Sequence, residues 1–324
     1  MILSDLLFAV GLVLLIKGGD WFVDGATGIA KRFNLPDIVV GATVVSIGTT
    51  LPEVMVSTTG ALAGSGAMAY GNAIGSIICN TALIAAISIT CNPGPVNVKS
   101  MKTPAIFFFG AAAMYCLAAY GLGTFPRWMG FVMLTVFVVY MVLTVRNGMK
   151  NPDSVEEEEE EDSKPKALWQ ELLLLVIGAA VIAVGADLLV EHGQIIAIGL
   201  GVPETVVALL FVALGTSLPE LVTTITSLKK GRASLGVGNV IGANVFNLVL
   251  VSGVAVSLAP FDVPCENLLL DTGLNLSLVF DIPVMLGVMS LMIFPAMATK
   301  KLGRWQGIAL LCIYAAFCVC QFVL

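Results

Sequence analysis

Charged residues are scarce in this sequence of 324 residues. They make up 12% of the chain, and 58% of the residues are hydrophobic, whereas about a quarter of a soluble domain is charged. Eight of the acidic residues fall within residues 153–162, so the rest of the chain is close to neutral. This composition excludes a soluble enzyme and a disordered chain. The sequence also lacks a basic patch, and we therefore expect no nucleic-acid partner.

The sequence offers few groups for thiol or imidazole chemistry. Its seven cysteines show no CxxC spacing, and we expect them to be buried apolar side chains rather than disulfides or metal ligands. A Ser/His hydrolase would depend on the only histidine, His192, which has no Gly-x-Ser-Gly partner. An aspartyl intramembrane protease would need paired membrane aspartates, but Asp20 lies close to Lys17. We therefore expect neither an enzyme nor a bound cofactor.

Long apolar stretches are what the sequence has in abundance. About 20 apolar residues suffice to cross roughly 30 Å of hydrocarbon. Ten such stretches occur, approximately at residues 3–30, 38–63, 69–91, 103–121, 127–146, 167–197, 204–228, 235–258, 276–296 and 304–323. The sequence therefore predicts an all-α membrane protein with ten transmembrane helices, surrounded by the lipid bilayer.

The cations fall unequally on the two sides that ten spans would create. Positive residues stay in cytoplasmic loops during membrane insertion. Fourteen Lys and Arg residues lie in one set of alternate loops, and Arg127 alone lies in the other set. This distribution predicts that both termini lie outside and that the acidic segment 147–166 is a cytoplasmic linker.

Two motifs occur twice in the chain, and the same offset along the sequence separates the copies of each. Gly-Thr-Thr-Leu-Pro-Glu at 48–53 matches Gly-Thr-Ser-Leu-Pro-Glu at 215–220. Gly-Asn-Ala-Ile-Gly-Ser-Ile-Ile-Cys-Asn at 71–80 matches Gly-Asn-Val-Ile-Gly-Ala-Asn-Val-Phe-Asn at 238–247. Because two separate motifs keep one register, we interpret the chain as an internal repeat.

The linker divides the ten predicted spans into two sets of five, residues 1–146 and 167–324. Because five is odd, the second half must enter the bilayer from the opposite side, so the two five-helix repeats are predicted to be inverted. Inverted repeats with proline-interrupted segments at corresponding places are typical of secondary transporters, whose site lies near the midplane between the halves.

Each predicted repeat carries a carboxylate at membrane depth, Glu53 in the first and Glu220 in the second. A charge at that depth costs about 2.5–3.5 kcal/mol even on lenient insertion scales, and the sequence places no Lys or Arg there to compensate it. We therefore expect a bound cation between the two carboxylates. Pro52 and Pro219 each remove one helix hydrogen bond nearby, so a backbone carbonyl can face such a ligand.

Hydroxyl and amide groups surround each carboxylate in the predicted helices. Residues spaced i, i+3, i+4 and i+7 lie on one helix face. The residues that share a face with a carboxylate in this way, within 46–53 and 213–220, are Ser46, Thr49, Thr50, Ala213, Thr216 and Ser217. The next span of each half adds Ser76, Asn80 and Asn247. Such oxygen atoms suit Ca2+ or Na+, and the lack of His and Cys among them argues against zinc or copper.

Two other interpretations of these residues stay open. Small polar residues also hold membrane helices together, although that role requires no pair of uncompensated acids. A channel can be lined by the same oxygen atoms. Flux that saturates and requires a counter-ion would distinguish a carrier from a pore.

The two repeated motifs, Gly-Thr-Ser-Leu-Pro-Glu and Gly-Asn-x-Ile-Gly-Ser/Ala, resemble the alpha repeats of the cation/calcium exchanger superfamily, specifically its Na+/Ca2+ exchanger branch. The resemblance implies a secondary active antiporter that exchanges Ca2+ for Na+ by alternating access, with Ca2+ extrusion driven by Na+ entry. By analogy we expect a prokaryotic exchanger in the plasma (inner) membrane, and we expect it to be a monomer. The transported ions are then its substrates.

The resemblance also implies a set of ion ligands. They are Ser46, Thr49, Thr50, Glu53, Ser76, Asn80, Ala213 through its carbonyl, Thr216, Ser217, Glu220 and Asn247. The chain departs from the family pattern at two places: many relatives carry Ser where Ala243 stands, and several carry Asp where Asn247 stands. These departures leave the ion stoichiometry open. A Ca2+/H+ or K+-dependent Na+/Ca2+ antiporter is the alternative, although the proton-coupled branch typically shows Gly-Asn-x-x-Glu in place of the Thr-Ser-Leu-Pro-Glu run.

Overall fold

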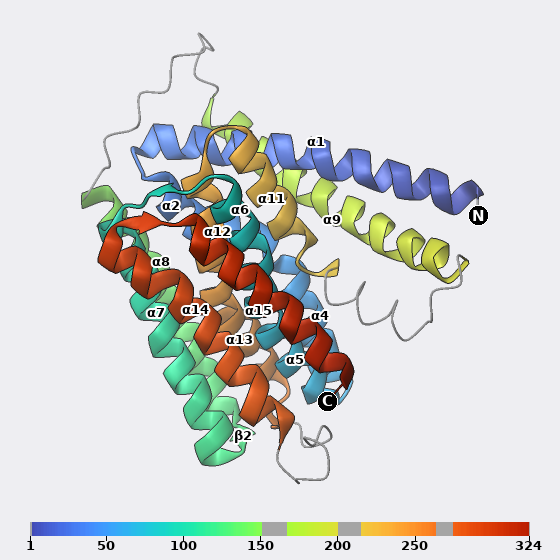
Figure 1. Ribbon diagram of the computed structural model, residues 1–324, viewed down its shortest axis with the longest axis vertical. Coiled ribbons are helices and arrows are strands. Elements are labelled where there is room, and N and C mark those ends of the chain that lie inside the picture. Colours follow the sequence, from blue (N-terminus) through green and yellow to red (C-terminus); the bar gives the residue numbers. More distant parts are fainter. Residues whose placement is uncertain (1, 151–166, 200–214, 264–274, 324) are drawn as a thin grey trace.

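The structure, a computed structural model, describes residues 2–150, 167–199, 215–263 and 275–323. Helices account for nearly all of this part of the chain (Figure 1). The all-α prediction is therefore confirmed for the described residues, apart from four two-residue strands that connect helix ends.

The first half contains eight α-helices, three wider π-helical segments and two strands. The α-helices are α1 (Ile2–Phe33), α2 (Asp37–Val40), α3 (Ser46–Thr49), α4 (Leu51–Leu62), α5 (Gly66–Cys79), α6 (Ala86–Cys91), α7 (Val98–Cys116) and α8 (Arg127–Lys150). The π-helical segments are η1 (Gly41–Val45), η2 (Asn80–Ala85) and η3 (Leu117–Leu122). The strands are β1 (Gly94–Pro95) and β2 (Thr124–Phe125).

The described part of the second half is built from the same kinds of element. Its α-helices are α9 (Leu168–Gly199), α11 (Leu218–Lys229), α12 (Ala233–Phe246), α13 (Ser252–Leu258), α14 (Ile282–Thr299) and α15 (Arg304–Val323). Its π-helical segments are η4 (Asn247–Val251) and η6 (Ser277–Asp281), and its strands are β3 (Phe261–Asp262) and β4 (Lys301–Leu302). The offset of the sequence motifs also relates both ends of α4, α5 and β1 to those of α11, α12 and β3. The repeat therefore extends to local structure.

Eight described helical stretches are long and apolar enough to cross a membrane. A ninth is formed if the bent pair Asp37–Thr49 and Leu51–Leu62, whose axes differ by 46°, counts as one span. The span predicted at 204–228 begins outside the described residues, which contain its later part as α11. Nine of the ten predicted spans thus correspond to described helices, and the tenth corresponds in part.

α1 and α9 pack closely along their length because glycines lie in their interface. A Cβ added at Gly11 would lie 2.9 Å from the Gly185 carbonyl oxygen, and one added at Gly25 would lie 2.6 Å from that of Glu171. Because the residue numbers of the contacts rise along α1 while they fall along α9, the two helices are antiparallel. Figure 1 shows α1 and α9 side by side across one end of the molecule. The axes of α7, α8 and α14 lie at a large angle to those two helices.

α12 lies at the centre of the described helices. All of its residues from 235 to 246 are buried, and it contacts α2, η1, α3, α5, α7 and α11. Small residues permit these contacts, as they do in many membrane interfaces. A Cβ added at Gly242, for example, would lie 2.5 Å from the Cα of Ala42.

Two antiparallel strand pairs connect the halves. β1 pairs with β4, with Gly94 opposite Leu302, and β2 pairs with β3, with Thr124 opposite Asp262. Each pair joins a loop of the first half to a loop of the second half, so helix ends from the two halves are held together at these positions.

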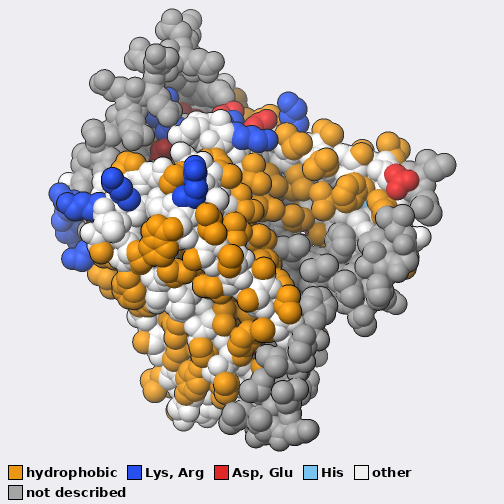
Figure 2. Space-filling model, viewed as in Figure 1, with side chains coloured by type: hydrophobic (Ala, Val, Ile, Leu, Met, Phe, Trp, Pro, Cys, Tyr) orange, Lys and Arg blue, Asp and Glu red, His pale blue; other side chains and the backbone are white. Residues whose placement is uncertain are grey.

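The surface has the character expected within a lipid bilayer. On the face that Figure 2 shows, hydrophobic side chains cover much of the surface, and Lys and Arg side chains gather towards one end. Trp128 and Trp169, which lie near span ends, are 57% and 65% exposed. Soluble proteins rarely expose apolar surface on this scale, so the chain is a multi-pass membrane protein.

The prediction for the cysteines is confirmed only in part. The six described cysteines are free, and Cys79 is buried. Cys91 and Cys312 are exposed, because an apolar side chain on a membrane helix can face lipid as well as protein. Cys265 lies outside the described residues.

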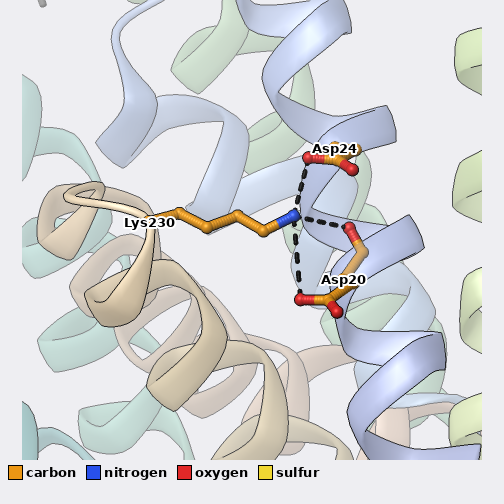
Figure 3. Close-up of polar contacts among 3 residues, drawn as sticks. All are labelled: Asp20, Asp24 and Lys230. Carbon is orange, nitrogen blue, oxygen red and sulfur yellow. Dashed lines mark hydrogen bonds and ion pairs between the residues drawn. The ribbon is translucent and has the colours of Figure 1, made fainter.

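Ion pairs connect α1 and α2 to elements of the second half. Lys230, just after α11, lies 2.7 Å from Asp24 Oδ1 and 3.8 Å from Asp20 Oδ1, and it donates to the Asp20 carbonyl at 3.0 Å (Figure 3). Arg232 lies 3.0 Å from both carboxylate oxygens of Asp37, the first residue of α2. The sequence does not identify Lys230 as the partner of Asp20 and Asp24.

Candidate cation-binding site

The helices that carry Glu53 and Glu220 each begin two residues before the glutamate. α3 ends at Thr49 and α4 begins at Leu51, with Pro52 in its first turn. A proline is tolerated there because the N–H groups of a first turn have no intrahelical partner. Ser217 and Pro219 occupy the corresponding places before and within the first turn of α11. Each glutamate therefore lies at the positive end of a helix dipole, which favours a carboxylate.

The two glutamates are fully buried and lie near one another. Both are 0% exposed, and the charge of Glu220 acts on Glu53. The Thr49 and Thr50 hydroxyls lie beside the Glu220 carboxylate, but none of the four carboxylate oxygens completes a hydrogen bond within the described part of the chain. Neither glutamate forms an ion pair with a described residue. Among the described residues, no cation and no hydrogen-bond donor therefore compensates the two neighbouring carboxylates.

Further buried polar atoms nearby also lack partners among the described residues. They are Thr50 Oγ1, Ser217 Oγ, Asn80 Oδ1 and Nδ2, and Asn247 Oδ1. Leaving one buried polar atom unpaired costs about 1–3 kcal/mol, so each such atom in a native fold requires an explanation. A cation bound among these oxygen atoms would supply one.

π-helical turns place the two asparagines. Asn80 begins η2 and Asn247 begins η4, and such wide turns are frequent at functional sites because they loosen the helix hydrogen bonding. η2 contacts α11, which carries Glu220, and η4 contacts α4, which carries Glu53. Each asparagine thus lies beside the helix that carries the glutamate of the other half.

The remaining predicted ligands differ in their surroundings. Ser76 is buried on α5, one turn before Asn80. The Ser46 hydroxyl has the Gly41 carbonyl of its own span as its nearest acceptor, at 2.8 Å, and two acceptors of Asn239 at 3.0 and 3.3 Å. Ala213 lies outside the described residues, and the Ala243 carbonyl accepts a bond of 3.0 Å from Asn247 Nδ2.

Two asparagines that the sequence analysis did not select contact the predicted ligands. Asn239 Oδ1 accepts hydrogen bonds from Thr49 at 3.1 Å and from Ser46 at 3.3 Å. Asn72 Oδ1 accepts one from Thr216 at 3.5 Å. The signal that identifies them was present in the sequence, because they are the second residues of the two copies of the repeated Gly-Asn motif.

The donor set determines which ions the arrangement can hold. In the described part of the chain, there is no group of three or more His, Cys, Asp or Glu residues placed to hold a metal ion. What the spans bring together is two carboxylates with hydroxyl and amide oxygens. Hard cations such as Ca2+ and Na+ prefer these ligands.

Comparison with known proteins agrees with this chemistry. A family model described as "Sodium/calcium exchanger protein" matches residues 4–146 and 171–323. The chain is 34% identical to an uncharacterized membrane protein, MJ0091, of Methanocaldococcus jannaschii over 95% of its own length and 94% of that protein. It is 28% identical to the sodium/calcium exchanger MaX1 of Methanosarcina acetivorans, with 98% of each chain covered. A structure of the sodium-calcium exchanger NCX_Mj superposes with a TM-score of 0.78 at 33% identity, covering 97% of both chains.

Proposed function

The chain belongs to the sodium/calcium exchanger family, and we propose that it extrudes Ca2+ in exchange for Na+ that enters down its gradient. The observation that carries this proposal is the pair Glu53 and Glu220, which are fully buried and, among the described residues, without ionic partners. Transported ions are the missing counter-charge. The chain then acts as a transporter and needs no cofactor.

The proposed ligands come from both halves of the chain. They are Ser46, Thr49, Thr50, Glu53, Ser76, Asn80, Ala213 through its carbonyl, Thr216, Ser217, Glu220 and Asn247. The unpartnered oxygens of Thr50, Ser217 and Asn80 support this assignment most directly.

The proposed architecture is two inverted five-helix repeats, residues 1–146 and 167–324, with ten spans and a linker at 147–166. The same offset in residue number relates α4 to α11 and α5 to α12, which supports the repeat. The antiparallel packing of α1 against α9 supports the inversion, because these two helices occupy equivalent places in the halves. The unequal distribution of Lys and Arg supports external termini and a cytoplasmic linker, in a plasma membrane.

Obligatory exchange follows from the electrostatics of this site. When the site is empty, two like charges face each other in a medium of low effective dielectric, which opposes the passage between inward-open and outward-open states. One Ca2+, or two or more Na+, neutralises the pair and permits that passage. If more charge enters with Na+ than leaves with Ca2+, each excess charge contributes about 2.3 kcal/mol per 100 mV of membrane potential.

The moving part in this proposal is the α1–α9 pair, which slides across the other helices. Glycines hold α1 and α9 tightly to one another, as at Gly11 and Gly185. The pair also contacts α11 and the broken first-half span, so its displacement would reach both helices that carry the glutamates.

A counter-transport assay tests the function. Vesicles containing the purified protein are loaded with Na+, diluted into Na+-free buffer, and assayed for Ca2+ uptake. We expect uptake that requires the outward Na+ gradient and saturates with Ca2+. Absence of gradient-dependent flux would refute the exchanger. Uptake driven equally by a pH step, or only with K+ present, would instead favour the proton-coupled or K+-dependent alternative.

A further inference from the structure

The hydroxyl groups of the proposed site need partners for their protons. A hydroxyl that binds a cation turns an oxygen lone pair toward it, and its proton must then be donated to another acceptor. In metal sites, such second partners fix the orientation of the ligand, and their loss typically weakens metal binding. The acceptors that face Thr49 and Thr216 should therefore influence cation binding.

Asn239 provides the acceptor for Thr49. Its Oδ1 accepts a hydrogen bond from Thr49 Oγ1 at 3.1 Å. The Ser46 hydroxyl also lies near Asn239, but its nearest acceptor is the Gly41 carbonyl at 2.8 Å. Asn239 and Thr49 are 0% and 1% exposed, so water does not compete for this bond. Asn239 belongs to α12 of the second half, whereas Thr49 ends α3 of the first half.

Asn72 provides the acceptor for Thr216, with the acceptor now in the first half and the donor in the second half. Its Oδ1 receives the Thr216 hydroxyl at 3.5 Å, while its Nδ2 donates to Ser57 Oγ at 2.8 Å and to the Glu53 carbonyl at 3.3 Å. The two bonds to α4 fix the amide, so its oxygen faces the second half. Asn72 therefore connects Thr216 to the backbone of the residue that carries the first carboxylate.

The two contacts form a reciprocal pair. In each, an asparagine of one half accepts the hydroxyl proton of a threonine that lies just before the glutamate-bearing helix of the other half. The two asparagines occupy equivalent positions of the internal repeat, and so do the two threonines. We propose that Asn72 and Asn239 are positioning residues that accept the protons of Thr216 and Thr49 and so direct their lone pairs to the transported cation. This inference rests on the proposed function.

The test is a double-mutant cycle on Asn239 and Thr49. Asn239→Leu removes the acceptor at similar size, and Thr49→Val removes the donor. We expect each single variant to raise the Ca2+ concentration for half-saturation about tenfold, as for the loss of one aligned hydrogen bond. The maximal rate should stay within about twofold. The double variant should match Thr49→Val, because Ser46 keeps the Gly41 carbonyl as its acceptor, and an acceptor that has lost its Thr49 donor has no further effect.

A merely structural role gives a different result. If Asn239 only joins the two halves, the effects of the two substitutions multiply, or the maximal rate falls while half-saturation is unchanged. Either result overturns the proposal. Asn147→Leu is the matched control. The Asn147 amide on α8 donates to the Thr103 hydroxyl on α7 in an exposed contact, so this substitution should leave half-saturation unchanged.

The second pair, Asn72→Leu and Thr216→Val, decides the question if Asn239→Leu does not fold, because both residues are only partly buried. Ca2+ binding to the purified full chain by calorimetry separates this inference from the proposed function. If the unmodified protein neither binds Ca2+ nor transports it, the exchanger itself is refuted. If the unmodified protein binds Ca2+ and Asn72→Leu binds it equally well, only the role of the asparagines is refuted.

Discussion

Replacing Glu53 with Gln removes one of the two buried charges while it keeps the shape of the side chain. In the described structure Glu53 and Glu220 have no other ionic partner, so the remaining carboxylate must balance a bound Ca2+ alone. Removing one member of a buried charge pair costs about 3–5 kcal/mol. At about 1.4 kcal/mol per tenfold, this corresponds to a loss of Ca2+ affinity of roughly a hundredfold to a few thousandfold.

The same substitution should have the opposite effect on the ion-free protein. An ionised carboxylate at membrane depth costs about 2.5–3.5 kcal/mol, and the neighbouring Glu220 adds repulsion. Glu53→Gln relieves both penalties. We therefore expect the purified variant to unfold at a higher temperature than the unmodified protein in chelator, and to lose the stabilisation that Ca2+ gives the unmodified protein.

Glu171 provides the matched control for the predicted direction of the change in unfolding temperature. It is 5% exposed but accepts a bond from Arg32 at 3.1 Å, so Glu171→Gln breaks a satisfied pair and should lower the unfolding temperature without changing Ca2+ binding. Thermal unfolding with and without Ca2+ measures all three proteins. If Glu53→Gln lowered the ion-free unfolding temperature and kept the Ca2+ response, the two glutamates would not be the ion site.

Three further predictions concern the ligands and the moving helices. Lys230→Met removes the contacts with Asp20 and Asp24, whose side chains are 41% and 46% exposed. Stability should change by less than about 1 kcal/mol, while Ca2+ uptake rates in vesicles should change several-fold, because the ion pairs between α1 and the end of α11 are lost. Gly25→Val places a side chain against the Glu171 carbonyl and should destabilise the protein by about 1–3 kcal/mol, measured by thermal unfolding; an unchanged unfolding temperature would contradict the close α1–α9 packing. Asn247→Asp adds a third carboxylate and should raise Ca2+ affinity about tenfold, since ligand charge tunes such sites. Unchanged binding by calorimetry would place Asn247 outside the site.

The sequence by itself determined the membrane class and the internal repeat. Apolar length predicts spans with no knowledge of packing, because the bilayer fixes how many residues are needed. The constant offset between the motifs predicted which elements of the two halves correspond. The first residues of α4 and α11, Leu51 and Leu218, are separated by that same offset. Pro52 predicted the loss of a helix hydrogen bond, but the spacing of residues 46–53 predicted one continuous helix, whereas α3 ends at Thr49 and α4 begins at Leu51.

Only the tertiary structure decided which side chains meet. Lys230 binds Asp20 and Asp24 across 210 and 206 residues, and a helix pattern in one segment carries no information about a partner in another. The same holds for Asn239 and Thr49, which contact each other because α12 packs against the broken first-half span. Periodicity fixes the face on which a residue lies, whereas the partner of that face depends on how the helices pack, and packing is a property of the whole chain.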